Sequence, residues 1–165
     1  MQKTLYIVGG TMGVGKTAAC QALKARLENA VFLDGDWCWD MHPFQVTEET
    51  KAMVQRNICF LLNSFLHCSA YEHVIFCWVL HEQALLDSLL AELDTANCRV
   101  KVISLICGEA QLRKRLTQDV VRGLRAAEIV ERSAACLPLY DRLNTVKLDT
   151  SHLTPQETAE AIVKM

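Results

Sequence analysis

The most specific chemical pattern in the sequence is a run of eight residues that matches the spacing G-x-x-x-x-G-K-[ST] in full: Gly10-Thr11-Met12-Gly13-Val14-Gly15-Lys16-Thr17. Its three glycines allow the backbone to turn tightly and to approach a polyphosphate, so that successive amides form an anion nest. Lys16 can reach the β- and γ-phosphates, and the hydroxyl of Thr17 can bind Mg²⁺. The run therefore predicts a site for a nucleotide polyphosphate together with magnesium.

Two carboxylates follow the second apolar run of the chain, in Phe32-Leu33-Asp34-Gly35-Asp36. At the end of a strand beside the glycine-rich run, these carboxylates would face the γ-phosphate. One can hold a magnesium-bound water, and the other can accept the proton of an attacking hydroxyl. We assign Asp36 as the base and Asp34 to the magnesium, but the two roles could be exchanged. A solvated Asp-Gly turn is the alternative interpretation.

The elements that must position these residues alternate between strand and helix. Strands are expected at residues 4–8, 30–33, 73–80, 100–107 and 145–148. Helices are expected at 17–28, 47–67, 82–93, 108–117 and 126–137, with a last one that opens at a capping box formed by Thr154 and Glu157. This alternation predicts a parallel sheet covered on both faces, with ligands at the carboxyl ends of its strands. We expect a single domain, residues 1–165, with a three-layer α/β/α fold and a five-stranded parallel sheet.

Through these motifs, and through its architecture along the whole chain, the sequence resembles the small P-loop kinases related to nucleoside monophosphate kinases. That group includes shikimate and gluconate kinases, adenylylsulfate kinase, chloramphenicol phosphotransferase and the tunicamycin-resistance proteins. The Asp-Gly-Asp run looks like the D-x-D of several of these kinases. The resemblance implies the P-loop NTPase fold, ATP and Mg²⁺ as cofactors, and transfer of the γ-phosphoryl group to a hydroxyl of a small molecule: a metabolite, sugar, nucleoside or antibiotic.

The same resemblance assigns roles to three arginines and one threonine. Arg115, in a run similar to the family's L-x-x-R helix, would pack on adenine, and Thr150 lies in a loop that borders the adenine in related kinases. Arg122, and after it Arg125, would belong to a lid at about residues 117–126 and stabilise the transferring phosphoryl group. The alternatives are a solvated basic helix face and, for Thr150, a plain helix-entry turn. This basic stretch has no interleaved aromatic residues, so nucleic acid is not expected as a partner.

An aromatic segment directly after the carboxylates is a candidate for the acceptor pocket: Trp37, Trp39, Met41, His42, Pro43 and Phe44. It could equally pack onto the helix expected at 47–67. The strand at 73–80 lacks the aspartate of a Walker-B motif, a role that Asp34 or Asp36 could take over, and its end, Val79-Leu80-His81-Glu82, looks like the tunicamycin-resistance proteins. The short lid favours a small acceptor over a large nucleotide, but the sequence does not identify that acceptor.

Composition and the absence of certain motifs bear on the state of the cysteines, the location of the protein and the alternative functions. The chain has 165 residues, a formal net charge of -2 and eight cysteines without a CxxC pair, which predicts free, mostly buried thiols. It shows neither a signal peptide nor an apolar run near the ~20 residues that span a bilayer, so we expect a cytoplasmic protein. The sequence leaves open whether the protein is a monomer or a homodimer. The N-K-x-D and D-x-x-G motifs of GTPase-like switches do not occur. The main alternative is a P-loop protein that binds or hydrolyses NTP without a small-molecule acceptor.

Overall fold

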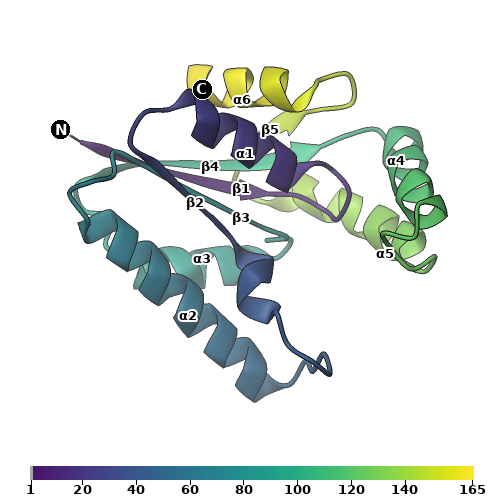
Figure 1. Ribbon diagram of the computed structural model, residues 1–165, viewed down its shortest axis with the longest axis horizontal. Helices are drawn as coiled ribbons and strands as arrows, with labels where there is room; N and C mark the ends of the chain where they lie inside the picture. The colour runs from purple at the N-terminus through teal and green to yellow at the C-terminus, as the bar shows by residue number, and fades with distance from the viewer. Residues whose placement is uncertain (1) are drawn as a thin grey trace.

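Five parallel strands form the central sheet of the computed structural model, which describes residues 2–165 (Figure 1). The strands are β1 (Lys3–Gly9), β2 (Ala30–Asp34), β3 (His73–Trp78), β4 (Cys98–Ile106) and β5 (Val146–Asp149). Their order across the sheet is β2-β3-β1-β4-β5, and each neighbouring pair is parallel. β1 is therefore central, and its carboxyl end leads directly into the glycine-rich run.

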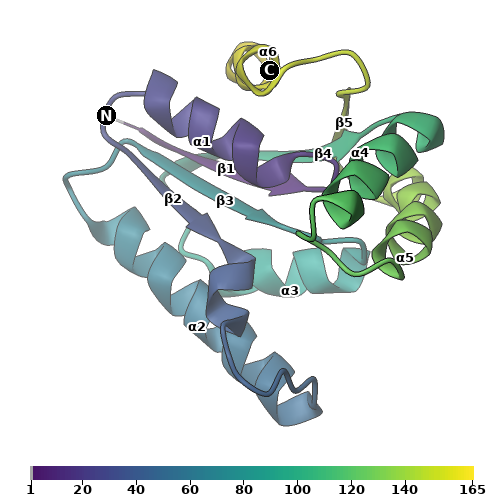
Figure 2. The same cartoon turned by 45° about the vertical axis from the view of Figure 1, so that its right-hand side comes forward.

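Helices cover both faces of the sheet, as the alternating pattern predicts (Figure 2). Helices α1 (Lys16–Arg26) and α6 (Pro155–Lys164) lie on one face, and α2 (Glu48–His67) and α3 (Gln83–Glu92) lie on the other. Because side chains alternate along a strand, β1 buries Tyr6 and Val8 in the core under α1 and α6, and Leu5 and Ile7 in the core under α2 and α3. The three-layer α/β/α architecture is confirmed.

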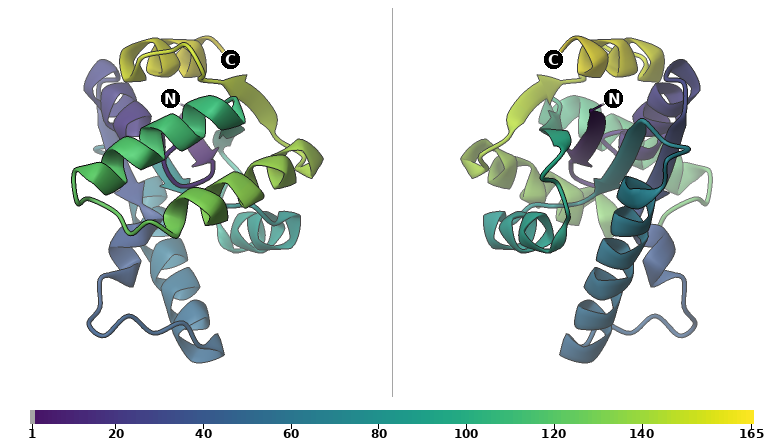
Figure 3. Two further views of the ribbon diagram at one scale, coloured as in Figure 1. Left: turned by 90° about the vertical axis from the view of Figure 1, so that its right-hand side faces the viewer. Right: turned by 90° about the vertical axis from the view of Figure 1, so that its left-hand side faces the viewer.

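A pair of helices stands beyond the carboxyl ends of the strands, α4 (Glu109–Val121) and α5 (Ile129–Cys136) (Figure 3, left). α4 is longer than expected: it continues past Thr117 because the Arg122 amide still donates to the Gln118 carbonyl, at 3.0 Å. Gly123, with φ 72°, then ends the helix in the left-handed conformation that glycine adopts easily. The predicted lid at 117–126 is therefore helical in its first half, and the α4–α5 connection is 122–128.

Two short 3₁₀ helices complete the chain, η1 (Gly35–Trp39) and η2 (Leu137–Arg142). The sequence pattern shows no regular period at the first of them. At the last helix the capping box is confirmed: the Glu157 amide donates to the Thr154 hydroxyl at 3.2 Å, and the Thr154 amide donates to the Glu157 carboxylate at 2.8 Å. All eight cysteines are free thiols. Across residues 2–165, no helix is both long enough and apolar enough to cross a bilayer.

Candidate active site

The glycine-rich loop between β1 and α1 is held in place by residues far away in the sequence. Gly13 has φ 82°, and a Cβ there would lie 2.4 Å from Cδ2 of Leu116 on α4, so only glycine fits. The amide of Gly10 donates to the Val79 carbonyl at 3.2 Å. The first N–H groups of α1, from Lys16 onward, have no acceptor within the helix and remain for an anion.

The side chain of Thr11 fixes the loop to α5 and is not free to bind a nucleotide, although its place in the loop predicts nucleotide binding. Its side chain is fully buried, and its hydroxyl donates to the Ser133 carbonyl on α5 at 2.8 Å. The Ser133 hydroxyl in turn donates to the carbonyl of Met12. Thr11 could therefore contact a nucleotide only through its backbone, while Ser133, which no sequence motif indicates, fixes the loop to α5.

Lys16 is the first residue of α1, directly after the glycine-rich loop. Its ammonium donates to the Thr11 carbonyl at 3.0 Å, across the mouth of the loop. Burial lowers the pKa of Lys16, and the nearby carboxylates of Asp36 and Asp34 act in the opposite direction. A partly desolvated ammonium flanked by backbone amides is well prepared to pair with a phosphate.

The two carboxylates at the end of β2 occupy different environments. Asp34 is buried, accepts a hydrogen bond from the Thr17 hydroxyl at 2.7 Å and accepts another from the Asp36 amide at 3.0 Å. Asp36 is more exposed. Desolvation raises its pKa, the neighbouring Asp34 raises it further, and Lys16 opposes both effects. Hydrogen bonds therefore hold the carboxylate of Asp34 in place, while the carboxylate of Asp36 remains accessible to ligands.

The donor atoms of Thr17 and Asp34 fit a magnesium ion. A hydroxyl oxygen and a carboxylate oxygen 2.7 Å apart are the hard oxygen ligands that Mg²⁺ prefers, and the ion usually takes one or two protein carboxylates and completes its shell with phosphates and water. Within residues 2–165, no group of three or more His, Cys, Asp or Glu side chains is arranged to hold a metal by itself.

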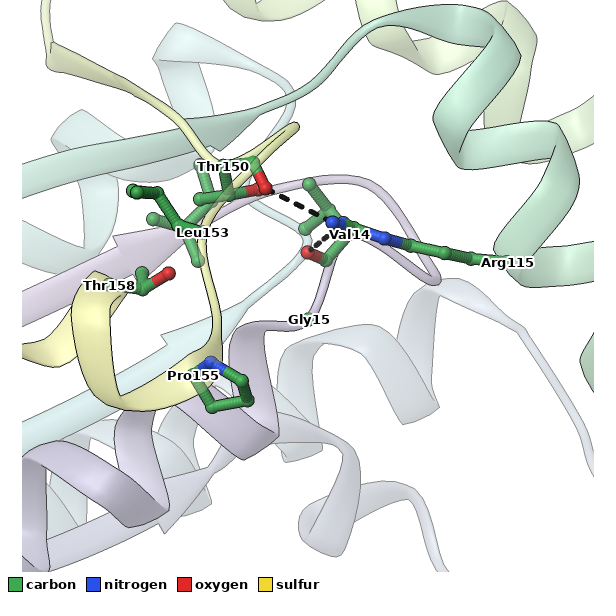
Figure 4. Close-up of a pocket in the computed structure, with 8 residues that line it drawn as sticks. Val14, Gly15, Arg115, Thr150, Leu153, Pro155 and Thr158 are labelled. Atoms are coloured by element: carbon green, nitrogen blue, oxygen red, sulfur yellow. Dashed lines mark hydrogen bonds between the residues drawn. The ribbon is translucent and has the colours of Figure 1, made fainter.

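A cavity of about 200 Å³ lies beside the loop and is built around Arg115 (Figure 4). The guanidinium of Arg115 donates to the Val14 carbonyl at 3.2 Å and to the Thr150 carbonyl at 3.0 Å, so it joins α4 to two loops. The remaining walls are mainly apolar: Leu105, Leu153, Pro155 and Thr158. Arg115 and Thr150 thus meet next to Gly15, at a place suited to a nucleoside.

A second cavity, of about 250 Å³, extends from the loop toward the carboxylates. Lys16, Thr17, Asp36 and Arg125 line it, and Arg125 donates to Asp119 at 3.2 Å. Arg122 is exposed at the end of α4 and is not among the described residues that line this cavity. Of the two lid arginines, it is therefore Arg125, and not the preferred Arg122, that lines the same cavity as Lys16 and Thr17.

A third and larger cavity, of about 840 Å³, begins where the second one ends, because Met12 and Asp36 line both. Trp39 and Phe44 of the aromatic segment line the third cavity. Trp37 faces elsewhere and packs edge-on against Phe32, with ring centroids 5.3 Å apart.

Three further residues of this cavity come from distant parts of the chain: Trp78 and His81 at the end of β3, and Arg132 on α5. The end of β3 has an unusual backbone, since Leu80 has φ 44°, and the Val79 carbonyl accepts from the Tyr140 hydroxyl at 2.6 Å. This turn ends the strand at Trp78, two residues before the expected end. The Walker-B position is thus occupied by a turn that delivers side chains to the cavity.

The all-parallel sheet and the loop between β1 and α1 define the chain as an α/β protein of the P-loop NTPase class. It belongs to the family described as the AAA domain, whose model matches residues 7–131. A search among curated proteins found no significant match.

Solved structures share the fold over nearly the whole chain. A gluconokinase from Sinorhizobium meliloti 1021 is 16% identical, with a TM-score of 0.69 and coverage of 98% of this chain and 92% of that one. The tunicamycin resistance protein of Deinococcus radiodurans is 18% identical, with a TM-score of 0.68 and coverage of 99% of this chain and 95% of that one. The Mycobacterium tuberculosis APS kinase, solved in complex with AMPPNP and APS, is 14% identical, with a TM-score of 0.69 and coverage of 99% of this chain and 96% of that one. The resemblance to this group of small P-loop proteins is confirmed at the level of the fold.

Proposed function

We propose that the chain is an ATP-dependent kinase that transfers the γ-phosphoryl group to a hydroxyl of a small molecule. One observation carries the proposal: the second cavity, which Lys16 and Thr17 line and which we call the phosphate cavity, meets the larger cavity at a single exposed carboxylate, Asp36. A protein that only hydrolyses NTP needs no second cavity that opens onto its transfer site. The kinases among the structural neighbours support the same interpretation.

The proposed reaction assigns a role to each side chain at the junction. The amides of the loop and Lys16 hold the β- and γ-phosphates, and Arg125 approaches the transferring group, where fixed positive charge stabilises the transition state. Magnesium, held through Thr17 and Asp34, would neutralise charge on the phosphates. Asp36 accepts the proton of the acceptor hydroxyl as its oxygen bonds to the γ-phosphorus, the bond to the β–γ bridging oxygen breaks, and ADP leaves.

The nucleoside has a separate place in this proposal. The cavity around Arg115, which we call the nucleoside cavity, shares Gly15 with the phosphate cavity, so a nucleotide could extend from one to the other without a gap. We propose ATP as the donor on the basis of the family resemblance and of the APS kinase neighbour, whose structure is a complex with the ATP analogue AMPPNP.

The test is acceptor-dependent ADP release from Mg·ATP, measured with a panel of sugars, sugar acids, nucleosides and antibiotics. Lys16→Ala should abolish ADP release and strongly weaken ATP binding. Asp36→Asn should abolish release but retain ATP binding, because its carboxylate acts on the acceptor and not on the nucleotide. ADP release that no acceptor stimulates, or full activity in Asp36→Asn, would refute the proposal.

A further inference from the structure

The lining of the largest cavity is mostly apolar and aromatic. Trp39, Phe44 and Trp78 present rings to it, and the remaining walls are largely aliphatic. Its volume of about 840 Å³ lies in the range of pockets that bind drug-sized molecules. It is therefore larger and less polar than a site needs to be for a small polyol.

Two of these rings, Trp39 and Trp78, also pack against the core under α2 and α3, which supports them from behind. Trp39 packs against Phe44 with ring centroids 5.6 Å apart, and Trp78 packs against Phe76 with centroids 6.5 Å apart. Gly35 lies directly against the Trp78 indole, since a Cβ at Gly35 would be 2.6 Å from Cγ of the indole. Both tryptophans remain only partly buried. An aromatic side chain that is fixed on one side and accessible on the other is suited to stack on a flat ligand.

Polar side chains are few in this cavity: Asp36, His81 and Arg132. Nδ1 of His81 is buried without a hydrogen-bond partner, while its Nε2 lies 3.4 Å from Glu82. A polyhydroxy acid would bring many hydroxyls into these walls, and each one left unpaired weakens binding. A molecule with one reactive hydroxyl and a few hydrogen-bonding groups on a ring avoids that cost.

We propose that the acceptor is an alcohol carried on an aromatic or heteroaromatic ring system, stacked on Trp39 and Trp78 with its hydroxyl toward Asp36, and not a sugar acid or a free polyol. The inference rests on the proposed kinase function, because it names the acceptor of the same site. It concerns binding in the large cavity, however, and can be measured without phosphoryl transfer.

The test is calorimetric titration of the full chain, first with ADP and magnesium and then with two ligand sets. One set contains ring-bearing alcohols, namely nucleosides and phenyl-substituted diols. The other contains gluconate, shikimate and free hexoses. Trp39→Ala should weaken the ring-bearing ligands about tenfold, the size of a lost aromatic contact. Trp37→Ala is the matched control, since Trp37 is 53% exposed, lies on the same 3₁₀ helix and does not line the cavity. Trp39→Phe, which keeps a ring, should restore most of the affinity.

The results separate the two proposals. Binding of ring-bearing alcohols that depends on Trp39 and not on Trp37 supports the inference, whether or not transfer follows. Tighter binding of the polyhydroxy set, equal effects of the two alanine variants, or no binding by any ring-bearing alcohol overturns it. Failure of ADP to bind would instead refute the kinase function, and the ring-bearing set would still be judged on its own affinity for the large cavity.

Discussion

Arg115 offers the sharpest quantitative test of the nucleotide site, because one half-buried side chain joins three segments. Its guanidinium donates to the Val14 carbonyl in the glycine-rich loop and to the Thr150 carbonyl in the loop before α6, from a position on α4. In Arg115→Met the aliphatic stem, and with it most of the packing, remains. The substitution therefore removes the two hydrogen bonds and little else.

The expected magnitude follows from those contacts. A hydrogen bond that involves a charged group contributes about 1.5–3 kcal/mol, and water can replace part of this around a side chain that is only half-buried. We expect the free energy of unfolding to fall by about 1.5–3 kcal/mol for the pair of bonds. Because the same bonds hold two walls of the nucleoside cavity together, ADP affinity should fall about tenfold, or about 1.4 kcal/mol.

Urea unfolding and calorimetric titration with ADP measure the two quantities, and Arg113→Met is the control. Arg113 lies on the same helix, but its ion pairs with Glu109 at 2.8 Å and Glu131 at 2.6 Å are exposed, and such pairs contribute about 0–1 kcal/mol. Arg113→Met should leave ADP affinity unchanged. Equal losses of stability in the two variants, or unchanged ADP affinity in Arg115→Met, would show that Arg115 does not organise the nucleoside cavity.

Three further predictions concern the junction of the cavities. Because desolvation and then Asp34 raise the pKa of Asp36, the stability that Asp36 contributes should be fully present below about pH 4, the ordinary carboxyl value, and should be lost as pH rises toward the raised pKa. In urea unfolding, the free energy of unfolding of the wild type relative to Asp36→Asn should therefore fall across that range, and a constant difference between the two profiles would contradict the assignment. Arg125→Gln should lower kcat about 100-fold or more and Arg122→Gln by no more than about twofold, with the reverse order arguing for a different lid position during turnover. Gly35→Ala should displace the Trp78 indole, cost about 1–3 kcal/mol of stability and raise the acceptor KM at unchanged ADP affinity; an unaltered KM would mean that this indole does not bind the acceptor.

The local parts of this site could be predicted from the sequence. The run around Lys16 and the pair Asp34 and Asp36 are each encoded within a few residues, next to strands whose apolar character is plain. Thr11 shows the limit of such reasoning, because its partner Ser133 is 122 residues away and becomes its neighbour only when α5 docks. Arg132 lacked a local signal for the same reason, since it belongs to no motif and reaches the cavity only through the packing of α5. His81 lies in a segment that the sequence analysis singled out, but its place in the cavity depends on the turn that ends β3.

The direction in which a side chain points within a short segment also could not be predicted from the sequence. Trp37 and Trp39 are two positions apart in a 3₁₀ helix, where about three residues complete a turn, so they point in different directions and only Trp39 meets the large cavity. Arg122 and Arg125 are separated by Gly123, whose left-handed backbone turns the chain after α4. Arg125 lies beyond this turn and lines the phosphate cavity, whereas Arg122 lies before it and does not, and the spacing of the two arginines in the sequence does not reveal that difference.

Asp36, which lines both the phosphate cavity and the larger cavity, also bears on whether the phosphoryl group moves directly from donor to acceptor. With donor and acceptor spaces open to each other at one point, no protein group needs to carry the phosphoryl group between them. Initial-rate plots should then intersect as they do for a ternary complex, and a chiral γ-thiophosphate should emerge with inverted configuration at phosphorus after one in-line displacement.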